Sequence, residues 1–299
     1  MSDSEAWTVG RLLNWTASYL APQSSSPRLD AEVLLAAARN CERIELYTAF
    51  DQQPSEQVLA TFRELVRRRA QGEPVAYLVG QREFYSLTFR VTPDVLIPRP
   101  ETEDLIVALL DEVQRREKSE PLSIADVGTG SGIIAICAAK RIPHCHVTAI
   151  DISQAALAVA RANAEQHAVD EQMDFVESDL LAQLPDARFD LIVSNPPYVS
   201  EAEFGELPRE VADYEPRGAL LAGRTGTEVI ERLVAEAATR LKPAGALIVE
   251  ISPMIESRVR EQFAAQGGYD LLSTVKDLAG RPRVVIARRD DDDNQAGGS

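Results

Sequence analysis

The sequence predicts an α/β fold in which buried strands alternate with helices, preceded by a small helical domain. Two observations predict it. Short apolar runs with strand character recur behind a glycine-rich turn, at residues 122–127, 145–150, 173–177 and 189–194, whereas the first 70 or so residues show helical spacing and no such turn. With 299 residues, 45% of them hydrophobic, the chain is long enough for two domains and a substantial core.

The N-terminal part is predicted to be a helical domain over residues 1–75. Trp7 to Leu20 forms one amphipathic stretch, which a polar, proline-bounded loop at residues 22–27 ends. Further helices are expected over residues 29–39 and 55–69, with Ser55 as the N-cap of the second.

Residues 76–100 are predicted to be a hairpin linker. Residues 84–91 alternate in strand fashion, and Pro93, Pro98 and Pro100 punctuate the segment from residue 92 to residue 100. The α/β domain is then expected to cover residues 101–289.

The first strand of that domain, residues 122–127, leads into a turn with Gly128, Gly130 and Gly132. Glycines let the backbone bend tightly and approach a ligand closely, with the amides of the next helix directed at it. The spacing differs from the Gly-x-Gly-x-x-Gly pattern of dinucleotide sites, and the phosphate-loop pattern with lysine is absent. Pyrophosphate and ATP binding are therefore disfavoured.

Acidic residues end the next two strands. Asp151 follows residues 145–150, where a carboxylate can take both hydroxyls of a ribose; the alternative is an N-cap of the following helix. Asp179 and Leu180 follow residues 173–177. There the carboxylate can accept from an adenine amino group while the leucine covers the ring.

The fourth strand, residues 189–194, runs into Asn195, Pro196, Pro197 and Tyr198. Two prolines stiffen this loop and remove two backbone donors. The Asn195 oxygen and a nearby carbonyl can accept both hydrogens of a planar –NH2 group, and the tyrosine ring can lie against its face. The plainer alternative is a turn that ends a strand and exposes a tyrosine.

In this order, the motifs resemble those of S-adenosylmethionine-dependent methyltransferases. The resemblance implies a Rossmann-like class I sheet with helices on both faces. It also implies that the glycine turn surrounds the amino-acid end of S-adenosyl-L-methionine, that Asp151 holds the ribose, and that Asp179 and Leu180 meet the adenine. The turn consists of Gly128, Thr129, Gly130, Ser131 and Gly132. The loop at Asn195 then belongs to enzymes that methylate adenine, cytosine or glutamine.

A narrower resemblance covers roughly residues 5 to 289. The segments at residues 74–84, 96–103, 211–220 and 276–283 are similar to those that distinguish release-factor glutamine methyltransferases from nucleic-acid methylases. This resemblance implies methylation of the glutamine amide in the Gly-Gly-Gln loop of peptide-chain release factors. One departure is Ser252-Pro253-Met254-Ile255, where the family tends to carry a glycine and later a glutamine.

The expected catalytic residues are Asn195, Pro196 and Tyr198, and the substrate is expected to contact Pro197 as well. Asn195 and the Pro196 carbonyl would accept the two amide hydrogens, while Tyr198 limits rotation. Arg99, Glu101 and Glu103 in the linker are expected either to clasp the substrate or, the favoured reading, to pair with one another.

Composition argues against several other classes. The 31 basic and 47 acidic residues give a net charge of −16, which disfavours nucleic acid as a partner. No apolar run reaches the roughly 18 residues of a membrane span, and no signal peptide is recognisable. The three cysteines are too scattered for a disulfide framework, and His144, Cys145 and His146 lack the further ligands of a zinc site. We therefore expect a cytoplasmic enzyme with no metal.

Three alternatives stay open from the sequence. They are a glutamine methyltransferase that acts on a ribosomal protein, a nucleic-acid adenine methylase, and a cofactor-binding scaffold without activity. The acidic tail, residues 290–299, is expected to be disordered.

Overall fold

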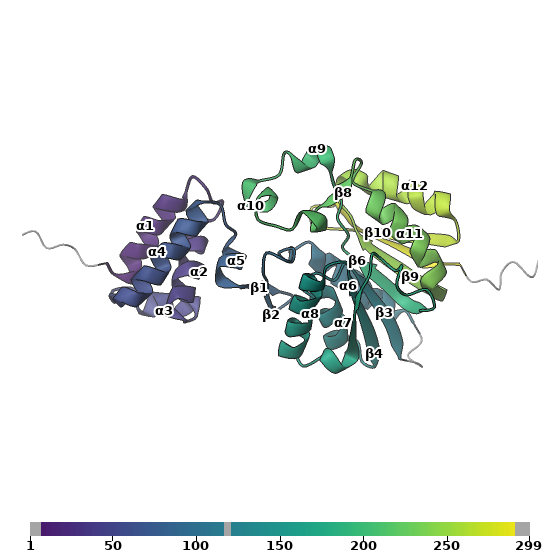
Figure 1. Ribbon diagram of the computed structural model, residues 1–299, viewed down its shortest axis with the longest axis horizontal. Coiled ribbons are helices and arrows are strands. Elements are labelled where there is room, and N and C mark those ends of the chain that lie inside the picture. The colour runs from purple at the N-terminus through teal and green to yellow at the C-terminus, as the bar shows by residue number, and fades with distance from the viewer. Residues whose placement is uncertain (1–6, 117–120, 291–299) are drawn as a thin grey trace, which may run out of the picture. The chain divides into compact units, whose positions relative to one another are not determined.

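The computed structural model describes residues 7–116 and 121–290 (Figure 1). The chain divides into two compact units. The helical unit comprises residues 1–81 and 208–214, and the sheet unit comprises residues 82–207 and 215–299. All but the first residue of the tail at 290–299 lie outside the described part of the chain.

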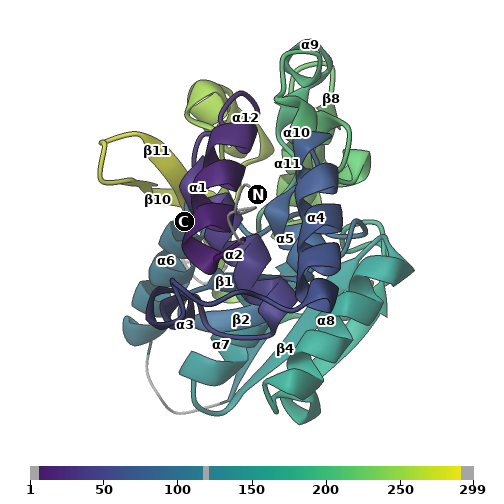
Figure 2. The ribbon, with the colours of Figure 1, turned by 90° about the vertical axis from the view of Figure 1, so that its left-hand side faces the viewer.

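The helical unit packs its helices around an apolar core that includes Leu13, Leu34 and Phe62. In Figure 2, α1, α2 and α4 lie side by side. Its helices are α1 (Val9–Leu20), α2 (Pro27–Arg39), α3 (Arg43–Thr48), α4 (Glu56–Ala70), α5 (Val75–Val79) and α10 (Arg209–Ala212). The N-cap predicted at Ser55 is confirmed, because its hydroxyl accepts a hydrogen bond from the Val58 amide. The short helices α3, α5 and α10 were not predicted.

A buried arginine ties the returning segment 208–214 to the rest of the helical unit. Arg69, at the end of α4, donates to the Asp30 carboxylate at 2.7 Å and to Glu210 at 2.9 Å. In addition, the Tyr214 hydroxyl donates to the Gln71 carbonyl at 3.2 Å. Residues more than 130 positions apart in sequence therefore belong to one folding unit.

The predicted hairpin is formed by β1 (Gln81–Phe84) and β2 (Leu87–Arg90). Tyr85 and Ser86 both have positive φ angles, 49° and 61°, as a tight two-residue hairpin turn requires. The Asn163 side chain, from α8 (Gln154–Gln166), bonds both the amide and the carbonyl of Arg90, at 2.8 and 3.0 Å. The hairpin is thereby fixed to a helix of the sheet unit.

The sheet unit is built on a seven-stranded sheet in the order β10-β11-β9-β6-β3-β4-β5. The four strands predicted from the sequence are confirmed as its centre and one edge: β3 (Leu122–Val127), β4 (Cys145–Asp151), β5 (Met173–Glu177) and β6 (Phe189–Ser194). They pair in parallel, and β9 (Leu241–Glu250) is parallel to β6. The last strand, β11 (Pro282–Arg289), is antiparallel to both of its neighbours, β9 and β10 (Tyr269–Lys276).

Alternate residues of the central strands lie in two separate hydrophobic cores, because successive side chains of a strand point to opposite faces of the sheet. Ile124 and Leu191 lie in one core, which α6 (Thr102–Gln114) and α7 (Ile133–Arg141) cover. Ala125 and Ile192 lie in the other, which α11 (Glu228–Arg240) and α12 (Glu256–Gln266) cover. The predicted sheet with helices on both faces is thus confirmed (Figure 1).

Short elements complete the sheet unit. They are η1 (Asp170–Gln172), β7 (Val199–Ser200), α9 (Glu201–Phe204), η2 (Arg217–Ala219), β8 (Leu221–Gly223) and η3 (Pro253–Ile255). Of the helices in the described part of the chain, none combines the length and the apolar character that crossing a membrane needs.

Candidate functional site

A cavity of about 470 Å³ lies at the carboxyl ends of β3, β4, β5 and β6, within the sheet unit. The strand order reverses at β3, since β4 and β5 follow on one side and β6 on the other. Ligands of open α/β sheets bind at such a point. The cavity brings together most of the predicted site residues: Gly128, Thr129, Gly130, Ser131, Asp151, Asp179, Leu180, Asn195 and Pro197.

The glycine turn after β3 forms one wall. Gly128, Gly130 and Gly132 all have positive φ angles, between 56° and 84°. A Cβ atom on Gly132 would also lie 3.2 Å from the Cβ of Ala160, which is closer than ordinary van der Waals contact. At these positions the chain therefore requires glycine.

The buried carboxyl group of Asp126 holds the glycine turn in place by hydrogen bonds. Asp126 is completely buried, and its Oδ2 accepts from the Thr129 hydroxyl at 2.6 Å and the Ala135 amide at 3.0 Å. Burial raises the pKa of Asp126 to about 7. No role for this residue was predicted from the sequence, although an acidic residue within a buried strand is itself an unusual feature.

Asp151, at the end of β4, is positioned by two backbone amides. Its Oδ2 accepts from Gly130 and its Oδ1 from Ser153, each at 2.9 Å. Burial raises the pKa of this carboxyl group, and the two hydrogen bonds oppose that effect. The N-cap of α8 is Ser153, whose hydroxyl accepts from the Ala156 amide, so the alternative role of Asp151 as that cap is wrong.

Contacts with α11 hold the segment of Asp179 and Leu180, which follows β5. Asp179 Oδ2 accepts from Arg232 at 2.8 Å, and the Leu181 amide donates to Glu236 at 2.8 Å. Between them, Leu180 has a φ of 51°, an uncommon value for a leucine. Arg232 also lines the cavity, which the sequence did not indicate because it lies 53 positions from Asp179.

The loop after β6 forms the opposite wall. The Ser194 hydroxyl donates to the Val127 carbonyl at 2.7 Å and ties the end of β6 to that of β3. Asn195 is half-buried, and its Nδ2 donates to the Thr102 hydroxyl at 3.1 Å. Burial raises the pKa of Tyr198 to about 12, so its hydroxyl stays neutral. Pro196 is buried and Pro197 lines the cavity.

The linker charges pair with other parts of the sheet unit. Arg99 forms an ion pair with the buried Glu215, whose carboxylate also accepts from the Ile97 amide at 3.2 Å. Glu103 accepts from the Tyr85 amide at 3.1 Å. Glu101 forms an ion pair with Arg283 at 3.8 Å. The expectation that Arg99, Glu101 and Glu103 pair with one another is therefore wrong; these contacts support a role in holding local structure.

The histidine pair offers no metal site. His146 bonds Asp174 at 2.7 Å at the surface, whereas His144 lies before β4 with a φ of 56°. Within residues 7–116 and 121–290, no group of three or more histidine, cysteine or acidic side chains is arranged to hold a metal ion.

Comparisons with known proteins agree with this architecture. Residues 105–207 match the family model "Methyltransferase small domain", and residues 11–80 match "PrmC N-terminal domain". The hMettl16 catalytic domain, solved with the MAT2A 3′UTR hairpin 6, superposes with a TM-score of 0.56 at 16% identity, over 77% of this chain and 83% of that one. At this identity the likeness concerns the fold alone.

Two curated relatives cover nearly the whole chain, and both are named release factor glutamine methyltransferase. The one from Rhodopirellula baltica is 50% identical over 291 residues, 96% of this chain and 98% of the relative. The one from Koribacter versatilis is 43% identical over 270 residues, 90% of this chain and 94% of the relative.

The strand order, with its antiparallel last strand and a cavity at the point of reversal, defines a class I methyltransferase. The near full-length identity then assigns the particular family. The chain belongs to the release factor glutamine methyltransferases.

Proposed function

We propose that this protein transfers a methyl group from S-adenosyl-L-methionine to the side-chain amide nitrogen of the glutamine in the Gly-Gly-Gln motif of peptide-chain release factors, in the cytoplasm. The observation that carries the proposal is the hydrogen bonding of the Asn195 side-chain amide. Its Nδ2 is engaged by Thr102, which leaves its oxygen as an acceptor at the wall of the cavity. An acceptor at this place suits an –NH2 group.

The residues around the cavity fit the cofactor. A volume of about 470 Å³ lies in the usual range for sites of small ligands. The glycine turn gives close backbone approach for the amino-acid end, and each Asp151 oxygen, although it accepts one amide, retains a lone pair for a ribose hydroxyl. Asp179 and Leu180 would meet the adenine. When bound, the cofactor supplies an electrophilic methyl group on a sulfonium.

The protein's task is then to orient a poor nucleophile. The lone pair of an amide nitrogen is delocalised into its carbonyl, which also enforces planarity. Asn195 and the Pro196 carbonyl would accept the two amide hydrogens and turn the face of the nitrogen toward the methyl group, while Tyr198 and Pro197 limit its movement. Such positioning contributes roughly 7 to 11 kcal/mol, and the acceptors stabilise positive charge developing on nitrogen.

The ribose assignment has its own test. Asp151→Ala removes the proposed acceptor of the ribose hydroxyls and should weaken cofactor affinity, measured by calorimetry with S-adenosyl-L-methionine. Asp174→Ala is a suitable control, because Asp174 lies on the neighbouring strand and is largely exposed, bonded to His146. Equal affinity of the Asp151 variant and the wild type would remove the assignment.

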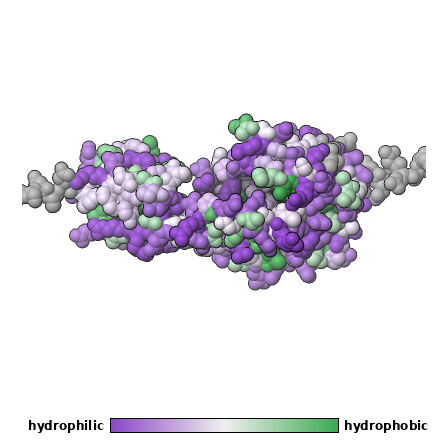
Figure 3. All heavy atoms as spheres, turned by 90° about the horizontal axis from the view of Figure 1, so that it is seen from above, coloured by the Kyte–Doolittle hydropathy of each residue, from purple (hydrophilic) through white to green (hydrophobic). Residues whose placement is uncertain are grey.

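We also propose that the helical unit docks the protein substrate, through an aromatic groove of about 310 Å³. The groove is lined by Trp7, Leu12, Trp15, Tyr19, Phe62, Arg63, Val66 and Arg67. Trp15 and Tyr19 stack at 5.0 Å and are about half exposed, on a molecule whose visible face in Figure 3 is mostly hydrophilic. Arg63 and Arg67 line the groove and, although Arg67 also pairs with Glu64, their positive charges favour an acidic segment of the substrate.

Removal of both rings tests the docking surface. In Trp15→Ala with Tyr19→Ala, KM for an intact release factor should rise at least about tenfold, as loss of interface aromatics commonly causes. Transfer to a short Gly-Gly-Gln peptide should not change, since the peptide lacks the acidic segment that we propose binds the groove. Ile44→Ala is the control, because Ile44 is 66% exposed and does not line the groove. An unchanged KM for the intact factor would argue against docking here.

The acceptor is tested directly with a labelled methyl donor. Purified release factors, ribosomal proteins and oligonucleotides are offered in parallel, and the product is digested and located by mass spectrometry. We expect label only in release factors, at the glutamine of the motif. Label in a ribosomal protein or an oligonucleotide instead, or cofactor binding without any transfer, would refute the proposed substrate.

A further inference from the structure

The amide of Asn195 has two ends of nearly equal size, and only its oxygen can accept a hydrogen bond. A half-turn about the last side-chain bond would present the –NH2 end to the acceptor nitrogen and abolish the proposed role. The fold must therefore fix which end faces the cavity. In the structure, Nδ2 points away and donates to the Thr102 hydroxyl at 3.1 Å.

Thr102 itself is constrained by a second buried group. It is the first residue of α6 and is completely buried, and hydrogen bonding from its hydroxyl lowers the pKa of the Glu250 carboxyl group, against the larger effect of burial. Glu250 is the last residue of β9, the strand that neighbours β6, and it is only 2% exposed. The carboxyl ends of β6 and β9 and the first residue of α6 thus supply the three side chains, which lie far apart in sequence.

The order of donors and acceptors follows from the charge of Glu250. An ionised carboxylate can only accept, so it takes the single hydrogen of the Thr102 hydroxyl. The oxygen of that hydroxyl is then restricted to accepting, and the only end of the Asn195 amide that can donate to it is Nδ2. The Asn195 oxygen is left facing the cavity.

We propose that Thr102 and Glu250 are positioning residues, which hold the Asn195 amide with its oxygen toward the nitrogen that is methylated. The inference rests on the proposed function, since it concerns the acceptor of that reaction. Thr102 also lines the cavity, but the role proposed for both residues is to act through Asn195.

The surroundings of Glu250 make this orientation depend on pH. Burial is the main cause that raises the pKa of Glu250 to about 7, with Glu101 and Asp104 acting in the same direction, while Thr102 and Arg283 oppose it. Tyr198 also faces the group and stays neutral. Glu250 Oε2 has no hydrogen-bond partner among the described residues, so no other donor offsets the burial.

Protonation reverses the chain of hydrogen bonds. A protonated Glu250 can donate to Thr102, whose own hydrogen is then free to point at the Asn195 oxygen and turn the amide over. The pKa is raised, so the proton is bound below about pH 7 and lost above it. Turnover should accordingly fall as the pH decreases through about 7.

Substitutions at Thr102 test the positioning. Thr102→Val keeps the shape but removes the hydroxyl, and kcat for a release factor should fall roughly 10- to 100-fold, as expected for loss of a buried hydrogen-bonded contact in the transition state. Affinity for S-adenosyl-L-methionine, measured by calorimetry, should stay as in the wild type. Thr102→Ser retains the hydroxyl and should restore kcat. Thermal melting of both variants shows whether they are folded.

The pH profile of kcat separates positioning from a merely structural role. Wild type should lose turnover below about pH 7, whereas Glu250→Gln, whose oxygen still accepts from Thr102 but cannot titrate there, should give a flat profile. A folded Thr102→Val variant with normal kcat would overturn the inference. So would a Glu250→Gln variant that still loses turnover below about pH 7. Absence of methylation by the wild type would instead refute the proposed function.

Discussion

Asp126 illustrates how a single residue of the site is maintained at a cost in stability. Its carboxyl group is completely buried, and although Oδ2 has two donors, Oδ1 has none among the described residues. Removing a charge from water without full compensation is unfavourable, which is why the pKa rises. The presence of a carboxyl group here is explained by the glycine turn, which Asp126 holds through its hydrogen bonds to Thr129 and to the amide of Ala135 in α7.

This cost predicts a pH-dependent effect of Asp126→Asn on stability. The folded protein binds the Asp126 proton up to about pH 7, whereas the unfolded chain loses it near about pH 4. Wild-type stability is therefore reduced as the pH rises between these values, and asparagine has no proton to lose. The variant's free energy of unfolding, relative to wild type, should rise by on the order of a few kcal/mol from about pH 4 to 7 and then level off.

Urea unfolding at a series of pH values measures this difference, because effects of all other titrating groups cancel in the comparison. Asp94→Asn provides a control at an exposed acid, bonded only to its neighbour Thr92. A difference between Asp126→Asn and wild type that does not change with pH would show that Asp126 is ionised in the folded protein throughout.

At the scale of elements, the position of the Asn195–Tyr198 loop depends on a neighbouring turn. Gly226 has a φ of 80°, and a Cβ built on it would lie 2.7 Å from the Tyr198 carbonyl oxygen and 3.4 Å from the Ser200 amide nitrogen. The turn before α11 thus packs backbone to backbone against the strand that leaves the loop, β7.

Gly226→Ala should therefore displace the loop. We expect turnover to fall while affinity for S-adenosyl-L-methionine changes much less, since Gly226 does not line the cavity. Gly205→Ala is the matched control, because its Cβ would meet only the Ala202 carbonyl at 3.6 Å, an ordinary contact, and its φ is −69°. If both variants turned over at the same rate, the loop would not depend on this contact.

The elements that the sequence predicted well are those with a long, regular signal. Buried strands such as β3 and β6 stand out as apolar runs, and Ser55 stands out as a cap before an apolar helix. Helices of four to six residues, such as α3 and α10, carry too few apolar positions for a period to be recognised.

Only part of the candidate site could be predicted from the sequence. The glycine turn, Asp151, Asp179 and Asn195 follow strand ends, and strand ends can be read from the sequence. Their partners cannot: Thr102 lies 93 positions from Asn195, and Arg232 lies 53 from Asp179. Only the folded sheet brings these pairs together, so their role could be recognised only in the structure.

At the scale of the whole molecule, the chain passes between its two units more than once. Segment 208–214 leaves the sheet unit to complete the helical unit, where Arg69 bonds both Glu210 and Asp30. The sequence, from which all of residues 101–289 were expected to form one domain, carries no signal for this return, because single contacts between residues far apart in the chain leave no periodic pattern.

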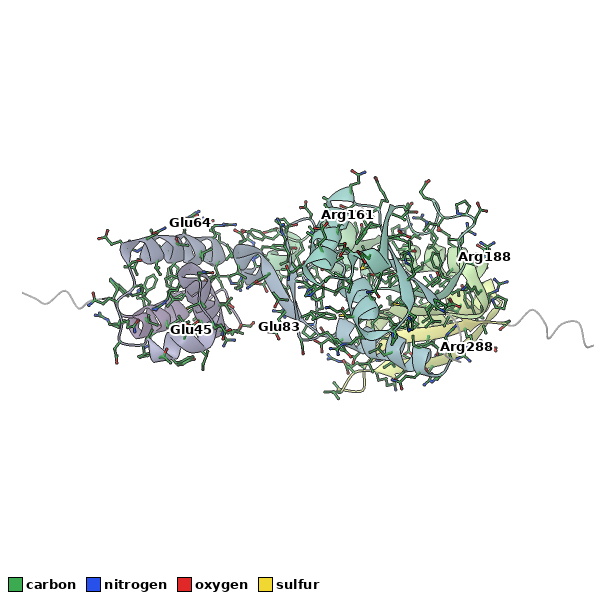
Figure 4. All side chains as sticks on the ribbon, turned by 90° about the horizontal axis from the view of Figure 1, so that it is seen from below. Glu45, Glu64, Glu83, Arg161, Arg188 and Arg288 are labelled. Carbon is green, nitrogen blue, oxygen red and sulfur yellow. The ribbon has the colours of Figure 1, made fainter. Side chains whose placement is uncertain are left out.

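Arg69 should accordingly matter to folding. Arg69→Gln leaves the Asp30 carboxylate buried without its cation, and such losses cost roughly 3–5 kcal/mol. Arg67→Gln is the control, since Arg67 and its partner Glu64 are both more than half exposed and Glu64 points outward from α4 (Figure 4). Chemical denaturation measures both. Equal stability of the two variants would show that the buried pair does not hold the unit together.

In the proposed reaction a carboxamide oxygen positions the glutamine amide beside the methyl donor, and Asn195→Ala removes that oxygen. Binding of S-adenosyl-L-methionine is measured by calorimetry, and single-turnover methylation of a release factor is followed by mass spectrometry. We expect nearly unchanged cofactor affinity and a loss of roughly 100- to 1,000-fold in the rate of transfer. A variant that binds the cofactor and methylates at a near-normal rate would contradict this role of Asn195.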